Sequence, residues 1–412
     1  MNEDLTFKEG EFGFVKYKSK NPFEFFHIIN ELEKTSEQDL EGWLLFPEHG
    51  EKPYPCMVCV HHSGGWGAAQ YEMIRDILES GIAVFQVNSF EARGVTSTTE
   101  EQMAVTTAMI MADAFEPLKF LSKHPDIDKT RIGICGWSLG AGSSLYAGWL
   151  PLAEKLAPEG ERFALHLNYY PLASYWPDEM RWTNAPMLNL IGDQDDYTPF
   201  ELAQKLTIGI NESGANCKDI LYAGGLHGFD SMYPKTFWPD SIAPKVSRFA
   251  KIDSKGDMTY ETDDGKVLAL NSPEDRLKLF EEVAKFGAWT GGTWQLRRDC
   301  KKDALNFLNS EFPSIARNFS PDSGSLSNYI RNTIGQRGKG FFKAEIERKK
   351  RTVSKEKLED KGRQIVDTDE QTDFDQRSRE DRGRVKVYPS SIKVIENNIT
   401  CLLYTSPSPR DS

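Results

Sequence analysis

Short apolar runs alternate with longer helical patterns along the first half of the chain. The apolar runs that predict strands cover residues 57–62, 83–88, 131–135, 163–169, 187–192 and 219–223. The patterns that predict helices lie at 70–80, within 100–123, at 139–150 and at 200–213. Strands that are apolar throughout and separated by helices indicate a parallel sheet covered on both faces. We therefore expect an α/β fold with a mostly parallel central sheet.

The pattern loosens after His227. Residues 258–270 predict a β-hairpin with an Asp-Gly pair at its turn. Two further helices are expected, over 273–287 and 294–310. Pro313 marks the expected end of the packed domain, so residues 1–312 are predicted to form one domain.

The remaining chain differs in composition. Residues 313–400 carry 19 Lys and Arg and 14 Asp and Glu, with few aromatic residues. Such a segment cannot bury enough apolar surface to offset the entropy of ordering, so we predict a tail that is disordered or partly helical. Residues 401–412, CLLYTSPSPRDS, resemble the conceptual translation of a sequencing-library adapter. We therefore expect that they are not part of the natural protein.

Composition mainly excludes classes of protein. The 412 residues are 39% apolar and 27% charged, which is ordinary for a globular chain. Residues 1–312 carry 30 Lys and Arg against 47 Asp and Glu, so no nucleic-acid-binding surface is expected there. No apolar run approaches the length that spans a membrane, and the charged N-terminus lacks the apolar core of a secretory signal. Six cysteines without a dense pattern do not make a disulfide scaffold, so we expect a cytoplasmic protein.

The strongest chemical signal is the sequence Gly-Trp-Ser-Leu-Gly at residues 136–140. It follows a predicted strand and opens a predicted helix, which is the setting of a nucleophile elbow. A sharp strand-to-helix turn forces Ser138 into a strained backbone conformation, and glycines on both sides relieve the crowding. The serine oxygen would then project from the carboxyl edge of the sheet, above a helix N-terminus that favours negative charge.

A serine nucleophile needs a base and a group that orients the base. His227 lies in GGLHGFD, directly after the last predicted strand, where an α/β sheet places a general base. Asp195 lies in IGDQDDYTP, in the loop after the preceding strand, with Asp193 and Asp196 as neighbouring competitors. The chain order Ser138, Asp195, His227 is that of α/β-hydrolases.

Backbone N–H groups are the expected donors to an oxyanion. One is the N–H of Leu139, the residue after the nucleophile. The second is expected from the loop HHSGGWG at 61–67, where glycines permit close backbone approach. Ser63 is the preferred donor in this loop, and Gly64 is the alternative.

Several motifs together resemble the dienelactone hydrolase family of α/β-hydrolases, in its branch with a serine nucleophile. The resemblance covers residues 40–312. It rests on HHSGGWG at 61–67, NSFEARGV at 88–95, GICGWSLGAG at 133–142, IGDQDDYTP at 191–199, LHGF at 226–229 and the stretch 285–308. It implies an eight-stranded, mostly parallel sheet and hydrolysis of esters or lactones through an acyl-enzyme.

The resemblance also suggests substrate-binding residues. Arg93 stands where the type enzyme binds a substrate carboxylate, although a structural role in bridging loops is an equal alternative. Trp66 and Trp137 could line an apolar pocket, or could belong to the core. The chain departs from the type enzyme of the family in having Ser138 for a cysteine, His62 for a glutamate and Ser231 for a second carboxylate-binding arginine. The dienelactone itself is therefore a poor candidate substrate.

The sequence thus predicts a serine hydrolase that acts on a small-molecule ester or lactone. A peptidase or acyltransferase with the same triad, and an inactive hydrolase fold that serves as a binding module, are the alternatives. No cofactor is required. No metal is expected, because Cys56 and Cys59 lie three residues apart on a strand and point to opposite faces. Nothing in the sequence indicates an oligomeric state.

Overall fold

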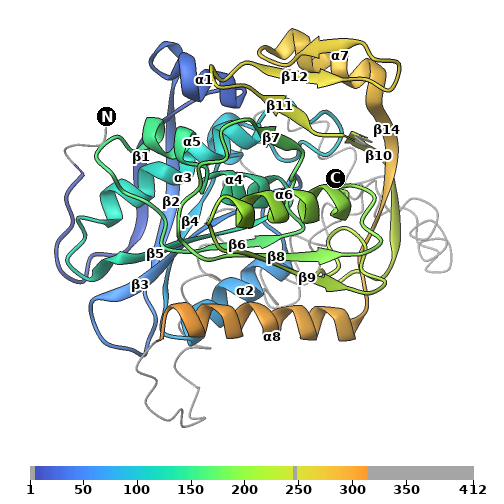
Figure 1. The fold of residues 1–412 in the computed structure, drawn as a ribbon. Helices are drawn as coiled ribbons and strands as arrows, with labels where there is room; N and C mark the ends of the chain where they lie inside the picture. The colour runs from blue at the N-terminus through green and yellow to red at the C-terminus, as the bar shows by residue number, and fades with distance from the viewer. Residues whose placement is uncertain (1–4, 245–247, 314–412) are drawn as a thin grey trace, which may run out of the picture. The chain divides into compact units, whose positions relative to one another are not determined.

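The computed structural model describes residues 5–244 and 248–313, so the predictions for the tail and for 401–412 lie outside the described residues, Pro313 excepted. Its centre is an eight-stranded sheet (Figure 1). The strand order is β1 (Gly13–Lys20), β2 (Glu37–Leu45), β4 (Ala83–Val87), β3 (Tyr54–Val60), β5 (Ile127–Trp137), β6 (His166–Tyr169), β8 (Met187–Gly192) and β9 (Cys217–Tyr222). Neighbouring strands from β4 to β9 are parallel, whereas the β1–β2 pair and the β2–β4 pair are antiparallel. This confirms the predicted sheet.

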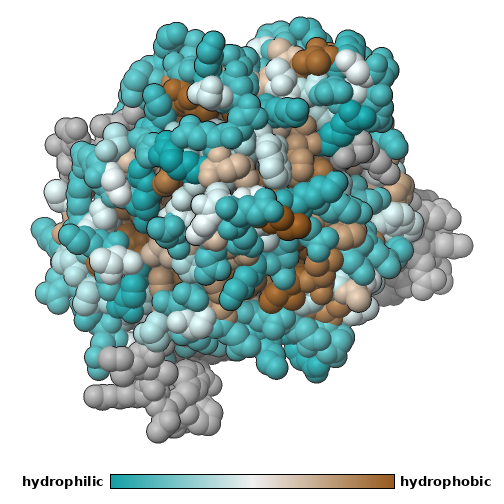
Figure 2. Space-filling model, in the orientation of Figure 1, coloured by the Kyte–Doolittle hydropathy of each residue, from teal (hydrophilic) through white to brown (hydrophobic). Residues whose placement is uncertain are grey.

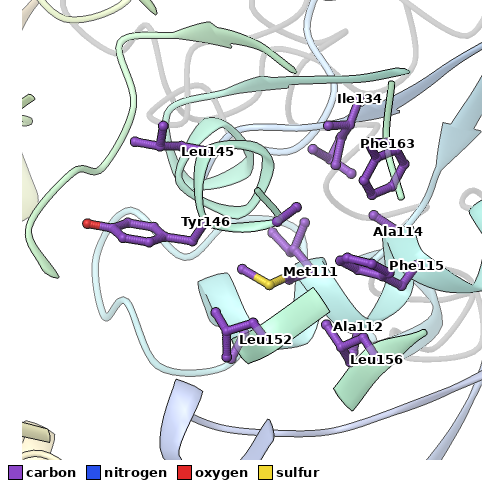
Figure 3. Close-up of a cluster of buried hydrophobic side chains, with 14 of the residues drawn as sticks. Met111, Ala112, Ala114, Phe115, Ile134, Leu145, Tyr146, Leu152, Leu156 and Phe163 are labelled. Carbon is purple, nitrogen blue, oxygen red and sulfur yellow. The ribbon is translucent and has the colours of Figure 1, made fainter. Parts of the chain in front are cut away.

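Helices cover both faces of the sheet (Figure 1). One face packs against α3 (Thr107–Leu121), α4 (Leu139–Tyr146), α5 (Leu150–Leu156) and α6 (Phe200–Glu212), and the other against α2 (Ala68–Glu79) and α8 (Trp294–Glu311). Figure 3 shows part of the first core, where Met111 of α3 lies near Leu152 of α5 and Phe115 of α3 lies near Phe163. Burying such side chains contributes about 1.5–3 kcal/mol each, which fixes α4 behind the turn that carries Ser138.

Two differences from the prediction lie in the first half of the chain. Strands β1 and β2 were not expected, because neither is a continuous apolar run; in β1, for example, the exposed Lys16 and Lys18 alternate with the buried Val15 and Tyr17. This alternation is typical of an antiparallel edge pair with one face in water. The single helix expected at 139–150 is instead two helices, α4 and α5.

The chain after β9 adds a second layer of structure. Strands β10 (Thr236–Pro244) and β14 (Ala284–Thr290) form a two-stranded antiparallel sheet. A four-stranded sheet contains β13 (Val267–Ala269), β12 (Met258–Glu261), β11 (Ala250–Ile252) and β7 (Tyr175–Pro177). The β12–β13 pair confirms the predicted hairpin. Helix α7 (Pro273–Val283) ends before the predicted residue 287, because the chain turns into β14.

The remaining helices are short and lie outside the sheet. They are α1 (Phe25–Asn30) and the 3₁₀ turns η1 (Leu32–Lys34) and η2 (Glu91–Arg93). The face of the molecule drawn in Figure 2 is mainly hydrophilic, with small apolar patches. Among the described residues, every helix is too short or too polar to cross a membrane.

Candidate active site

Ser138 sits at a sharp turn between β5 and α4. Its backbone has φ 53° and ψ −111°, a conformation that L-residues rarely adopt. A Cβ added at Gly136 would overlap the backbone of Gly140. A Cβ added at Gly140 would overlap the carbonyl oxygen of His61 and lie 2.7 Å from that of Val60. The two glycines are therefore required by backbone-to-backbone packing among β3, β5 and α4.

The three predicted side chains lie in one hydrogen-bonded chain. Ser138 Oγ lies 2.8 Å from Nε2 of His227, and Nδ1 of His227 lies 2.8 Å from Oδ2 of Asp195. All three residues are buried. With the Asp195 carboxylate as acceptor, Nδ1 carries the ring proton and Nε2 is free to accept the serine proton. The competitors point elsewhere, since Asp193 accepts the N–H of Gly224 and Asp196 accepts the N–H of Trp289.

The Asp195 carboxylate is held by its own loop. Its Oδ1 accepts the backbone N–H groups of Tyr197 and Thr198, both at 2.9 Å. The Thr198 hydroxyl lies 3.0 Å from Oδ2, 3.2 Å from Nδ1 of His227 and 3.2 Å from the carbonyl oxygen of Tyr170. Thr198 was not among the predicted site residues. The signal for it is an Asx-type turn, in which the aspartate side chain accepts the N–H groups of residues two and three positions later.

Two tyrosine rings flank the imidazole of His227. The ring centroids of Tyr170 and Tyr197 each lie 4.7 Å from that of His227, in edge-on geometry. Gln102 donates its amide to the Tyr197 hydroxyl at 2.6 Å. In the described part of the chain, the non-glycine residues with positive φ are Ser138, Gln102 and Tyr170. Backbone strain is thus concentrated around this site, as it is around functional sites generally.

A late strand also anchors the His227 loop. The N–H of Gly291 donates to the carbonyl oxygen of His227 at 2.8 Å, and Thr290 at the end of β14 forms a bridge with His227. The N–H of Trp289 reaches Oδ1 of Asp196 at 3.3 Å. Strand β14 therefore contacts both the histidine loop and the aspartate loop. Nothing in the sequence pattern of 284–290 signalled this contact.

Two backbone N–H groups remain candidates for an oxyanion site. Leu139 is the first residue of α4, so its N–H has no hydrogen-bond acceptor within the helix. Neither Leu139 N–H nor Ser63 N–H has an acceptor within residues 5–244 and 248–313. The alternative donor, Gly64, is excluded, because its N–H donates to Nδ1 of His62 at 2.8 Å.

The histidines of the 61–67 loop are neutral near neutral pH. Burial lowers the pKa of His61 to about 4. Burial, together with the neighbouring imidazoles of His61 and His227, lowers the pKa of His62 to about 3. Because Nδ1 of His62 accepts the Gly64 N–H, the neutral ring carries its proton on Nε2. These imidazoles add no positive charge to the site.

Arg93 is occupied by structural partners. Its guanidinium makes two hydrogen bonds with the buried carboxylate of Asp113, at 2.7 and 3.0 Å. It also donates to the side chain of Asn21 and the carbonyl oxygen of Ser89. Four donor contacts leave little of the group for a ligand. The structure thus contradicts the prediction that Arg93 binds a substrate carboxylate and favours the structural alternative.

The two tryptophans also belong largely to the interior. Trp137 is 0% exposed and stacks on Tyr169 at 5.1 Å in the core beneath α2 and α8, which contradicts a role in lining a pocket. Trp66 is half-buried, and its indole N–H donates to the carbonyl oxygen of Val87 at 3.0 Å. Its contact with substrate stays a prediction.

Within 5–244 and 248–313, no group of three or more His, Cys, Asp or Glu side chains is placed to hold a metal ion. Cys56 belongs to the core on the α3 side and Cys59 to the core on the α2 side. This confirms that the two thiols point to opposite faces of the sheet.

A mostly parallel eight-stranded sheet with helices on both faces, and a serine at a strand–turn–helix junction, define an α/β-hydrolase fold. A model of the dienelactone hydrolase family matches residues 40–250, slightly more than half of the chain. The chain belongs to this family and is a hydrolase by that membership. The match ends before α7, β14 and α8.

Solved structures give weaker similarity. A crystal structure of a putative dienelactone hydrolase from Klebsiella pneumoniae subsp. pneumoniae MGH 78578 is 16% identical, with 53% of this chain and 88% of that chain covered and a TM-score of 0.39. Thermogutta terrifontis esterase 2 bound to propionate is 17% identical, with 47% and 81% covered and a TM-score of 0.37. The same esterase phosphonylated by cyclosarin is 18% identical, with 47% and 81% covered and a TM-score of 0.38. No curated protein sequence matches. The fold assignment rests on the strand order and the family match.

Proposed function

We propose that the chain is a serine hydrolase that cleaves carboxylic esters through an acyl-enzyme. The observation that carries the proposal is the chain of two 2.8 Å contacts from Ser138 through His227 to Asp195, with Ser138 in a strained turn at the carboxyl edge of the sheet. Nucleophile, base and orienting carboxylate in this arrangement are the elements of acyl transfer.

In the first half-reaction, Oγ of Ser138 attacks the ester carbonyl while Nε2 of His227 takes its proton. Asp195 stabilises the resulting imidazolium, and the N–H groups of Leu139 and Ser63 stabilise the oxyanion. Collapse of the tetrahedral intermediate breaks the bond to the alcohol, which leaves with the proton from Nε2. Water then attacks the acyl-enzyme with His227 again as base, and the carboxylic acid is released as the serine is restored.

The charges near the site favour uncharged esters over substrates that bear a carboxylate. Arg93 is paired with Asp113, and Ser231 stands where the resemblance places a second arginine. His61 and His62 are neutral near pH 7, because burial lowers the pKa of both imidazoles. A p-nitrophenyl acetate substrate is therefore expected to give a higher kcat/KM than the p-nitrophenyl monoester of succinic acid.

The test of the proposal is labelling with a fluorophosphonate, followed by peptide mapping and assay with p-nitrophenyl acetate. The wild-type chain is expected to carry the label at Ser138, and Ser138→Ala to lose the label and about 10⁴–10⁶-fold of kcat. Ser143→Ala is the matched control, since Ser143 is buried in the same helix and donates to the carbonyl oxygen of Thr107. A folded wild-type chain that takes no label would favour the inactive binding module. Peptide amides cleaved faster than esters would favour a peptidase.

A further inference from the structure

Asp230 is a buried carboxylate three residues after His227, on the same loop. Its Oδ1 accepts the hydroxyl of Tyr170 at 2.9 Å. Among the described residues no lysine or arginine pairs with this carboxylate, since Arg297 donates instead to the main-chain carbonyl of Asp230 and to Glu72. A buried carboxylate without a cationic partner is costly, and such groups are concentrated at functional sites.

Tyr170 connects Asp230 to the imidazole. Its ring lies edge-on to His227 at 4.7 Å between centroids. Its carbonyl oxygen accepts the hydroxyl of Thr198, and its N–H donates to the carbonyl oxygen of Leu190 at 2.8 Å. The residue keeps a strained backbone with φ 40°. Tyr170 is therefore fixed at its backbone by the aspartate loop and at its hydroxyl by Asp230.

Several groups that face the Asp230 carboxylate are neutral near pH 7, whereas the guanidinium of Arg297 on α8 donates to the main-chain carbonyl of Asp230. The neutral groups come from three elements. They are Cys135 and Trp137 of β5, Tyr169 and Tyr170 at the end of β6, and Cys300 of α8. The imidazole of His227, on the same loop as Asp230, also faces the carboxylate. Burial raises the pKa of Asp230 to about 6, against the lowering effect of the hydrogen bond from Tyr170. The carboxylate thus changes charge in mildly acidic solution, close to an imidazole with which it interacts electrostatically.

We propose that Asp230, acting through Tyr170, is a second positioning residue for His227, and that its negative charge supports the imidazolium formed when Ser138 is deprotonated. This role rests on the proposed function, because an imidazolium forms at His227 only if it serves as the base. Asp195 contacts Nδ1 directly, whereas Asp230 acts across the tyrosine ring. Protonation of Asp230 removes the charge and lowers activity.

The test is the ratio of kcat/KM between the wild type and Asp230→Asn, measured with p-nitrophenyl acetate from pH 4.5 to 9. Above pH 7 the wild type carries the extra charge, and the ratio is expected to be on the order of tenfold. Below pH 5 both chains are neutral at this position, and the ratio is expected to approach one. A ratio that is the same at every pH would show a structural role alone and overturn the proposal.

Tyr170→Phe is the second variant, because it keeps the ring and removes the hydroxyl. Asp230 then loses the hydrogen bond that lowers its pKa, so the pH at which activity rises is expected to move upward. The matched control is the Tyr222–Asp303 pair, which makes a similar bond at 2.8 Å without touching His227. Asp303→Asn and Tyr222→Phe are expected to leave the pH profile unchanged, and a profile altered equally by these variants would contradict the proposal.

A second measurement separates the two proposals. NMR titration of the His227 ring needs no turnover, and Asp230→Asn is expected to lower the imidazole pKa by on the order of one unit. If the wild type hydrolyses esters but the variant leaves both the pH profile and this titration unchanged, the role of Asp230 is refuted and the proposed function stands. If the wild type takes no fluorophosphonate label and cleaves no ester, the proposed function fails. The proposed role of Asp230 in catalysis then fails as well, even if the titration shows that Asp230 and the His227 imidazole interact electrostatically.

Discussion

Ser138 and His227 lie 2.8 Å apart, yet they are held in place by different kinds of contact. The serine depends mainly on its immediate neighbours: a strand before it, a helix after it, and the glycines at 136 and 140. The histidine depends on groups from distant parts of the chain, which contact its ring and its backbone. They are Tyr170, Tyr197, Thr198, Thr290 and Gly291.

This difference decides how each half of the site tolerates change. Ser138 is held by close backbone packing, so substitutions around it should cause atoms to overlap and lower the stability of the fold. His227 is held by many polar and ring contacts, so single substitutions around it should alter the protonation and orientation of the imidazole while the protein stays folded. Three substitutions test this contrast.

Asp195→Asn is expected to have the largest effect, a loss of about 10⁴-fold in kcat. An amide in place of the carboxylate favours the wrong imidazole tautomer and no longer stabilises the imidazolium, while the shape of the loop is kept. Steady-state kinetics with p-nitrophenyl acetate measure the loss, and thermal unfolding should change little. Asp196→Asn is the control, because Asp196 accepts only the N–H of Trp289 in the described structure, and it should retain most of the activity.

Gly140→Ala tests the nucleophile side. The new methyl group would meet backbone carbonyls of β3 that cannot rotate away, so the free energy of unfolding should fall by about 3 kcal/mol. Urea unfolding followed by circular dichroism measures the change. Gly142→Ala lies in the same helix, where the nearest atoms are 3.1 Å away at Leu172 and the gain in helix propensity offsets the contact, so it should be nearly neutral. Equal losses in both variants would contradict the steric account.

Thr198→Val is expected to have the smallest effect, about tenfold in kcat/KM. The substitution keeps the volume but removes a hydroxyl that lies near Asp195, His227 and the Tyr170 carbonyl, and a hydrogen bond to a charged group contributes about 1.5–3 kcal/mol. Thr236→Val removes a hydroxyl that donates to the carbonyl oxygen of Pro234 and makes no hydrogen bond with Asp195, His227 or Tyr170, so it serves as the control. Unchanged kinetics in Thr198→Val would show that the backbone N–H groups alone hold the carboxylate.

The central sheet could be predicted because each of its parallel strands contains a short, mostly apolar run. Strands β1 and β2 were missed, since they are not continuous apolar runs and polar residues alternate with buried apolar ones along them. Helix α7 was predicted too long, because nothing local to 284–290 shows that these residues pair with β10 instead of continuing the helix. Secondary structure decided by a distant partner leaves little trace in a short window of sequence.

The same distinction holds at the site. Ser138, Asp195 and His227 follow strand ends, so their convergence could be inferred from chain order. The partners of Arg93 could not, because Asp113 lies on a helix whose position relative to the 88–95 loop is set by packing. The Trp137 side chain lies with Cys135 in the core beneath α2 and α8, because residues two apart on a strand share one face of the sheet.

The hydrogen bond from Gly291 to the carbonyl of His227 comes from a segment beyond residue 250, where the family match ends. A gene trimmed to the matched segment would encode all three side chains of the proposed triad and still leave the histidine loop unsupported along one edge. A segment that keeps the proposed triad supported must therefore extend to Gly291, beyond the residues 40–250 that match the family.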